Sequence, residues 1–219
     1  MPPTSSASPA SARDAGRGPG DAASDRAPGL RERSKAKRRA LIQRTAMRLF
    51  AERGFEHTTL AEIAEEAEVA VRTVTGYFPS KLDLGTSFMD EIAARLTAAF
   101  PLVPDADFVE ALDGWLTEEE QLFDPEFMEL VNAMHTANPG LLALGQARLT
   151  EATQAANAAL LAQVGLPADH PMFELCTAAV QAVIATHFTS FTTRTPSAER
   201  HEAVIVYLRA IIDAAKPLP

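Results

Sequence analysis

Two short amphipathic segments, joined almost without a linker, constrain the fold more than any other feature of this sequence. Residues 60–67 and 70–77 each carry apolar side chains at helical spacing, and the two segments meet at Val69. Thr58 or Thr59 can cap the first helix, and the second ends before Pro79. With the longer helical pattern of residues 34–53 before them, they predict a helix-turn-helix.

The second short helix is the candidate for the major groove of DNA, with the first bracing it. Arg72 can reach guanine edges or phosphates, and Gly76 leaves room for backbone to approach a phosphate. Ser80 is expected to cap the next helix. Lys81 begins that helix, where its charge and the helix N-terminus favour a phosphate. The candidate DNA-contacting residues are Arg33, Lys37, Arg38, Thr59, Val71, Arg72, Thr73, Thr75, Gly76, Tyr77 and Lys81.

The charges are divided unevenly along the chain. Residues 1–57 contain twelve Lys and Arg against six Asp and Glu, whereas residues 58–219 contain eight against twenty-three. A basic head on an acidic body indicates that only the head meets a polyanion; a solvated basic tail is the alternative. The acidic side chains of the bracing helix are expected to form a solvated face, or else to trim non-specific binding: Glu62, Glu65, Glu66 and Glu68.

The rest of the sequence also has helical periodicity, without β-alternation or a hairpin signal, so the predicted fold class is all-α. We expect a disordered tail at 1–30, a helix-turn-helix domain at 31–80 and a larger helical domain at 81–219. No membrane span or secretory signal is expected, and one cysteine fits a reducing cytoplasm. The further predicted helices are 81–100, 105–123, 124–136, 139–164, 171–191 and 196–215.

The run from Ala40 to Leu84, "ALIQRTAMRLFAERGFEHTTLAEIAEEAEVAVRTVTGYFPSKLDL", is similar to the DNA-binding domain of the TetR family of bacterial regulators. This resemblance implies a homodimer, a variable C-terminal ligand domain, and release of DNA when a small molecule binds, usually from a repressor. The matching residues are Ala46, Leu49, Phe50, Gly54, Phe55, Thr58, Thr59, Ile63, Ala64, Ala67, Val69, Thr73, Tyr77, Phe78 and Lys81.

Three positions depart from the family pattern. Glu68 stands where the family usually has Gly, in a turn that favours glycine, which predicts either backbone strain or a slightly different turn. Ala70 replaces a Ser and loses the N-cap hydrogen bond, worth roughly 1 kcal/mol. Thr75 replaces an aromatic that contacts phosphate in the family. Altered DNA affinity is therefore one expectation.

The last two helices are apolar over wide arcs, which indicates burial on more than one side. One side can face the subunit core and the other a second subunit, giving a four-helix seam; an internal helix pair in a monomer is the alternative. The candidate dimer-interface residues are Phe188, Phe191, Val204, Leu208 and Ile212.

Large side chains gather in the middle of the chain, as in the lining of small-molecule cavities. Arg148 is the only basic residue between Arg95 and Arg194, so it can pair with a ligand carboxylate or phosphate; exposure or pairing with Glu151 is the alternative. We expect a mainly apolar effector with at most one anionic group. The candidate ligand-binding residues are Phe88, Trp115, Phe123, Phe127, Met128, Met134, His135 and Arg148.

No enzyme signature is present: the histidines do not form HExxH, and there is no Gly-rich phosphate loop or Gly-x-Ser-x-Gly. No cofactor and no metal are expected. The predicted partners are a double-stranded DNA operator, a small effector and a second copy of the chain, at the nucleoid in the cytoplasm. A helical adaptor of the same fold that has lost DNA binding is the alternative function.

Overall fold

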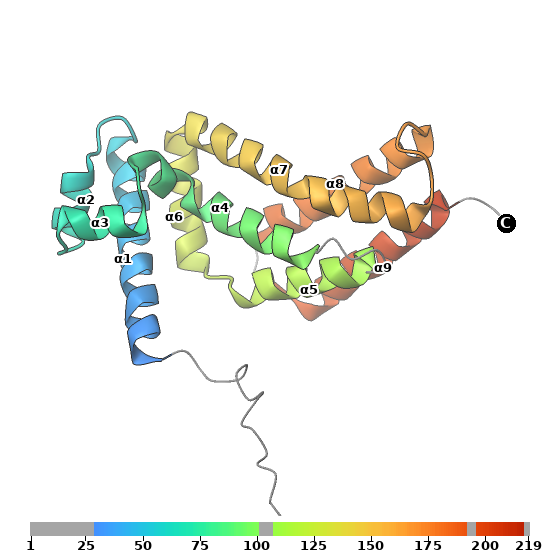
Figure 1. Ribbon diagram of the computed structural model, residues 1–219, viewed down its shortest axis with the longest axis horizontal. Coiled ribbons are helices and arrows are strands. Elements are labelled where there is room, and N and C mark those ends of the chain that lie inside the picture. Colours follow the sequence, from blue (N-terminus) through green and yellow to red (C-terminus); the bar gives the residue numbers. More distant parts are fainter. Residues whose placement is uncertain (1–28, 101–106, 192–195, 217–219) are drawn as a thin grey trace, which may run out of the picture. The chain divides into compact units, whose positions relative to one another are not determined.

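The structure is a computed structural model that describes residues 29–100, 107–191 and 196–216, without the side chains of residues 188–191. The described residues form helices and no strands, which confirms the all-α class (Figure 1). The predicted tail, residues 1–30, falls almost entirely outside the described part. The helices are α1 (Leu30–Arg53), α2 (Leu60–Glu66), α3 (Val71–Tyr77), α4 (Lys81–Ala99), α5 (Phe108–Gln121), α6 (Pro125–Ala137), α7 (Pro139–Val164), α8 (Pro171–Phe191) and α9 (Ala198–Ala215).

By its contacts the chain divides into two compact units, Met1–Lys37 and Arg38–Pro219. The boundary falls within α1, four residues into the predicted helix of residues 34–53. The second unit holds all the helices from α2 to α9.

Local side-chain bonds fix the ends of the short helices. Thr59 caps α2: its hydroxyl accepts a hydrogen bond from the Glu62 backbone N–H at 3.2 Å, and the Glu62 carboxylate accepts one from the Thr59 N–H at 2.7 Å. This reciprocal capping box satisfies two backbone donors. Ser80 caps α4: its hydroxyl accepts a hydrogen bond from the Asp83 backbone N–H at 3.0 Å and donates one to the Asp83 carboxylate at 2.7 Å. The predicted caps at Thr59 and Ser80 are present.

The turn between α2 and α3 carries the consequences of two unusual residues. Glu68 has a φ of 53°, in the left-handed region that favours glycine. The carbonyl of Ala64 nevertheless accepts a hydrogen bond from the Val69 N–H at 2.9 Å, which closes the turn. Ala70, at the N-cap of α3, makes no side-chain cap bond. Both local effects expected from the sequence are therefore found.

Two apolar cores lie along the second unit, and α4 contributes to both. Leu84 packs in the first core with the buried residues of α1, α2 and α3, and Val131 and Met134 of α6 join it. Ile92 and Leu96, further along α4, pack in the second core with α5, α7, α8 and α9. Helix α4 therefore takes part in both cores, on either side of its middle. The predicted domain boundary between residues 80 and 81 remains a prediction.

Close packing of α7 against α4 depends on a small residue. A Cβ atom on Gly145 of α7 would lie 2.7 Å from Cγ of Met89 and 3.0 Å from its Cβ. These atoms lie near the α4 backbone rather than at the flexible end of the side chain. Gly145 therefore permits the close approach of these two helices.

Candidate DNA-binding surface, ligand cavity and dimer surface

Helix α3 presents a mostly exposed surface with one buried anchor. Val74 is fully buried, whereas Val71, Arg72, Thr75 and Gly76 are exposed. A Cβ on Gly76 would meet nothing within 4 Å, so this edge of the helix is open. Two of the predicted DNA-contacting residues, Thr73 and Tyr77, are only half exposed.

Two other predicted DNA contacts already have partners in the chain. The Lys81 ammonium donates to the Phe55 carbonyl at 2.8 Å and lies 4.3 Å from the centre of the Phe55 ring. Lys81 therefore holds the segment between α1 and α2 in place, in addition to carrying a charge. The Thr59 hydroxyl is held by the α2 capping box. No pattern in the sequence indicates the bond from Lys81 to a distant carbonyl.

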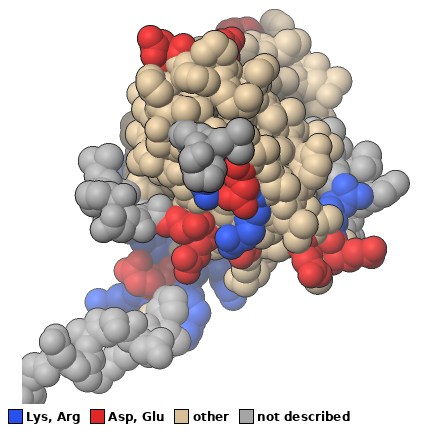
Figure 2. Space-filling view, turned by 90° about the vertical axis from the view of Figure 1, so that its right-hand side faces the viewer, with Lys and Arg blue, Asp and Glu red and all other residues tan. Residues whose placement is uncertain are grey.

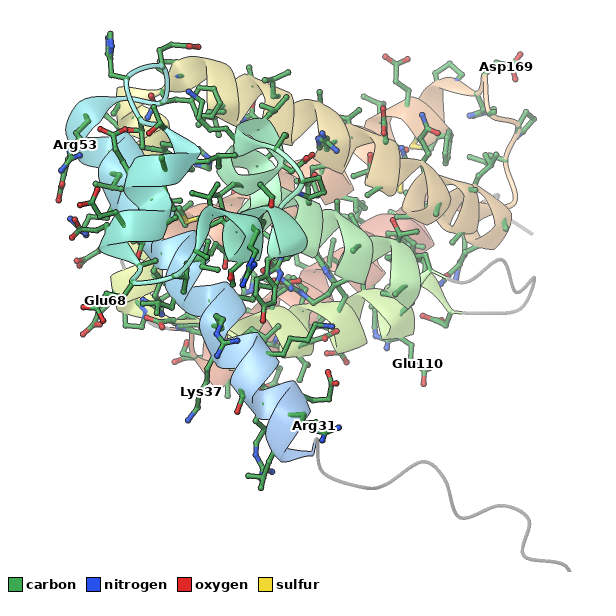
Figure 3. All side chains as sticks on the ribbon, turned by 60° about the vertical axis from the view of Figure 1, so that its left-hand side comes forward. Arg31, Lys37, Arg53, Glu68, Glu110 and Asp169 are labelled. Atoms are coloured by element: carbon green, nitrogen blue, oxygen red, sulfur yellow. The ribbon has the colours of Figure 1, made fainter. Side chains whose placement is uncertain are left out.

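The basic residues at the start of α1 are exposed. Arg33 and Lys37 belong to the first unit, and Figure 3 shows the Lys37 side chain pointing away from its helix. In the second unit Arg38 is exposed, but Arg39 forms an ion pair with Glu91 of α4. The Arg39 guanidinium also lies 4.7 Å from the centre of the Phe78 ring. Arg39 is thus a structural contact between α1, the end of α3 and α4.

Part of the acidic face of α2 is paired with arginines of α1. Arg48 Nη2 lies 2.6 Å from Glu66 Oε1, and the hydrogen bond to Glu66 raises the pKa of Arg48. Arg53 Nη1 lies 3.8 Å from Glu62 Oε1. The side chain of Glu68 points outward from the turn after α2 (Figure 3). These ion pairs are more than 40% exposed, so water screens them and each adds little to stability.

A cavity of about 400 Å³ lies among α4, α5, α6, α7 and α8. This volume lies within the range that is typical of small-molecule binding sites. Its walls are mostly apolar, and Gln181 and Ala185, which are exposed, lie at its opening. Four of the predicted ligand-binding residues line it: Phe88, Trp115, Met128 and His135.

The other four predicted ligand-binding residues lie elsewhere. Met134 is fully buried in the first core, and Phe127 packs edge-on against Phe88 with ring centres 5.7 Å apart. Phe123 is half buried and does not line the cavity. Arg148 Nε lies 3.3 Å from Asp90 Oδ1 of α4, so its partner is neither a cavity group nor Glu151. Three of the four lie on helices that line the cavity, but on other faces, and Phe123 lies in the link between α5 and α6.

The predicted dimer residues are divided between core and surface. Leu208 and Ile212 of α9 are 0% and 1% exposed, so they pack in the subunit's own core. Val204 is half buried and lines a surface hollow with Tyr207, while the side chains of Phe188 and Phe191 lie outside the described residues. The exposed large apolar residues on α8 and α9 are Met172, Leu175, Val206 and Tyr207.

Figure 2 shows a face that consists largely of uncharged residues, with Asp and Glu at its upper edge and, together with Lys and Arg, in its lower part. Exposed apolar side chains beyond scattered single ones are typical of protein–protein contacts. On α9, Val206 is exposed and was not among the predicted dimer residues; it lies two positions from the buried Leu208, on the opposite side of the helix.

Two histidines and two carboxylates form a partly buried cluster among α5, α8 and α9. His201 Nε2 lies 2.6 Å from Asp113 Oδ1, and its Nδ1 lies 2.9 Å from Glu120 Oε1. His187 Nε2 lies 3.0 Å from the same Glu120 oxygen. No group of His, Cys, Asp and Glu within the described ranges has an arrangement that could hold a metal ion. The sequence does not predict this cluster, because its members are far apart in the chain.

These features define a class: an all-α protein with an N-terminal helix-turn-helix and a helical body that encloses a cavity. Residues 42–85 match the family described as "Bacterial regulatory proteins, tetR family". This range runs from the middle of α1 to the first turns of α4 and contains both short helices. This segment is thus similar to the DNA-binding domain of the TetR family of transcriptional regulators, as the sequence resemblance predicted.

The chain is also 33% identical over 125 residues to the HTH-type transcriptional regulator TcmR of Streptomyces glaucescens, a match that covers 53% of this chain and only 55% of that protein. Among solved structures, it resembles the TetR family transcriptional regulator PfmR of Thermus thermophilus, with 20% identity, a TM-score of 0.48, and coverage of 78% of this chain and 97% of that one. The ketosteroid transcriptional regulator KstR2 of Mycobacterium tuberculosis is 16% identical, with a TM-score of 0.48 and coverage of 83% and 96%.

Within the residues that the structure describes, none of the helices combines the length and apolar character required to cross a bilayer.

Proposed function

We propose that this protein is a DNA-binding regulator that binds a near-palindromic operator as a homodimer and represses transcription until an effector releases it. The observation that carries the proposal is the family match at residues 42–85, within which α3 exposes Arg72, Thr75 and Gly76. A helix presented in this way fits the major groove, where an arginine can read guanine.

A dimer is the expected form because one half-site contact is weak. Two copies of α3 would read half-sites about one helical turn apart or slightly more. The exposed apolar residues Leu175 and Val206, on α8 and α9, support a self-complementary contact across a two-fold axis. This assignment moves the dimer surface from Leu208 and Ile212 to the opposite side of α9.

The cavity supports regulation by a small molecule. It is lined from α4, and α4 also packs in the first core with the helix-turn-helix. Suppose that α4 can adopt two placements and that the effector binds the protein more tightly in one of them. Effector binding then changes the protein's affinity for the operator, and operator binding changes its affinity for the effector by the same factor. The protein would act at the nucleoid in the cytoplasm, without catalytic activity.

The test is selection of an operator from random duplex DNA by the full-length protein, followed by affinity measurements at several salt concentrations. We expect a palindromic consensus and a log Kd that depends steeply on log salt, as phosphate neutralisation requires. A chain that selects no consensus and binds DNA weakly at all salt concentrations would instead be a helical adaptor of this fold.

A further inference from the structure

No side chain in the described lining of the cavity carries a formal charge. Its described lining residues include no Asp, Glu, Lys or Arg, although the chain as a whole is 22% charged. The one titratable side chain is His135, and burial lowers its pKa, so it is neutral at pH 7. Among the described lining residues, a ligand in this cavity therefore meets no ion that could compensate a charge of its own.

Two arginines that adjoin lining residues of the cavity, Arg95 and Arg148, are each paired with a carboxylate. Arg148 is bound to Asp90, and Arg95 donates two hydrogen bonds to the Glu119 carboxylate at 2.6 and 2.8 Å. The side chain of Glu119 is only 6% exposed, and its carboxylate is held in a bidentate geometry. Recruiting either arginine to an anionic ligand would leave a carboxylate without its partner, which is unfavourable for Glu119 above all.

Neutral hydrogen-bonding groups are present instead. Asn132, Asn157 and Gln181 line the cavity from three different helices, α6, α7 and α8. Within the described part of the chain, none of their side-chain amides makes a hydrogen bond. Each amide offers both donors and an acceptor, so together they can bind carbonyl and hydroxyl oxygens of a ligand.

We propose that the effector is an uncharged molecule, apolar over most of its surface, whose few oxygen or nitrogen groups hydrogen-bond to Asn132, Asn157 and Gln181. This inference rests on the proposed function, and it excludes carboxylates, phosphates and ammonium ions as effector groups that enter the cavity. The physical reason is desolvation: burying an unpaired charge is far more unfavourable than burying a hydrogen-bonded neutral group. It also replaces the expectation that Arg148 holds an anionic group.

The test uses three fluorescent probes that share one scaffold. They are N-phenyl-1-naphthylamine, which is neutral, its anionic 8-sulfonate, and the corresponding 8-sulfonamide, which is neutral and of the same size as the sulfonate. Binding to the full-length protein is followed by probe emission and by quenching of Trp115, the only tryptophan and a lining residue. Salt of about 0.5 M screens general repulsion of anions by the acidic body.

We expect the two neutral probes to bind at least about tenfold more tightly than the sulfonate. Asn157→Lys should place a cation in the cavity and reverse the preference toward the sulfonate. Gln154→Lys, on the exposed side of the same helix, is the matched control and should leave the preference unchanged. Gln181→Lys, at the solvent-exposed opening, provides the same test if Asn157→Lys does not fold.

Each remaining outcome overturns a different statement. Tighter or equal binding of the sulfonate to the unmodified protein would overturn the uncharged effector and leave the cavity as a ligand site. Exclusion of the sulfonamide along with the sulfonate would show that size, not charge, is selected, which also overturns the inference. Failure of all three probes to bind would remove the cavity itself as a ligand site, and with it the effector in the proposed function.

Discussion

Asn138 and Phe55 are joined across 83 positions of the chain by a hydrogen bond of 2.6 Å from the Phe55 backbone N–H to Asn138 Oδ1. The Asn138 Nδ2 donates to the Phe50 carbonyl at 2.9 Å and to the Met134 carbonyl at 2.8 Å. Asn138 lies at the junction of α6 and α7. One amide therefore satisfies the end of α1, the end of α6 and the segment that leads to α2.

Removing this amide should weaken the link between the body and the helix-turn-helix. We expect Asn138→Ala to lower the free energy of unfolding by about 1–3 kcal/mol, because partly buried backbone groups lose their partners. Asn138→Asp should be similarly unfavourable, since a carboxylate accepts from Phe55 but cannot donate to the two carbonyls. Denaturant titration measures both. An Asp variant as stable as the unmodified chain would contradict the role of the donated bonds.

Glu68, whose backbone lies in the left-handed region, predicts a substitution that stabilises the protein instead. Glu68→Gly should raise the free energy of unfolding by up to about 1 kcal/mol, because glycine adopts a positive φ without the steric cost of a Cβ. Glu65→Gly is the matched control: it lies on the exposed side of α2, in helical conformation, and should lose about 1 kcal/mol. Thermal unfolding of the pair should therefore shift in opposite directions.

Arg72 and Lys81 should affect DNA binding in different ways. The Arg72 side chain is exposed and makes no ion pair or hydrogen bond with the described residues, so Arg72→Ala should leave stability unchanged. Operator affinity should fall by about 1–3 kcal/mol, with one base preference relaxed. Lys81→Ala should weaken binding to all sequences and reduce the salt slope by about one unit.

The Lys81 variant has a second expected effect, because the ammonium also holds the Phe55 carbonyl. Lys81→Ala should lower the melting temperature, whereas Arg72→Ala should not. Operator binding like that of the unmodified protein in both variants would show that the assigned surface does not meet DNA.

The dimer surface can be tested by comparing the two sides of α9. Val206→Asp places a charge on an exposed apolar position, 62% accessible in the subunit, and should give a folded monomer with weak operator binding. Ile212→Asp places the charge in the core and should unfold the body instead. Sedimentation and circular dichroism separate these results. A Val206→Asp variant that remains dimeric would place the contact elsewhere.

The histidine cluster predicts a stability that declines on both sides of neutral pH. Burial lowers the pKa of His201, but hydrogen bonds to Asp113 and Glu120 outweigh burial and raise its pKa overall. Its contribution is thus complete below the ordinary histidine pKa of about 6.5 and is lost as pH rises through the raised value. Burial lowers the pKa of His187 despite the nearby Glu120, so its contribution is lost as pH falls.

The charged groups that face this pair are Asp113 and Glu120 of α5 and Arg200 of α9. His201→Gln should remove the alkaline decline in the free energy of unfolding and retain the acidic one. Denaturant midpoints measured from about pH 5.5 to 8.5 provide the comparison. An alkaline decline of unchanged size in His201→Gln would assign it to another group.

Features that depend on neighbours a few positions away could be predicted from the sequence alone. Helical spacing predicted the all-α class and the approximate helix boundaries, because a helix is built from contacts three and four residues apart. The Thr59 and Ser80 caps, the missing cap at Ala70 and the strained backbone at Glu68 were likewise predictable, since each depends on local backbone and the next turn. The resemblance of residues 40–84 to the TetR DNA-binding domain could also be predicted from the sequence.

The face of each helix that meets a given partner could not be predicted from the sequence, because long-range packing sets it. Helix α9 is apolar on two sides, so its periodicity could not tell that Leu208 and Ile212 enter the core and Val206 faces solvent. Arg148 and Met134 were assigned to the cavity, but Asp90 on α4 attracts the first, and the first core buries the second. The position of a cavity depends on the relative rotation and spacing of five helices, and long-range packing sets both.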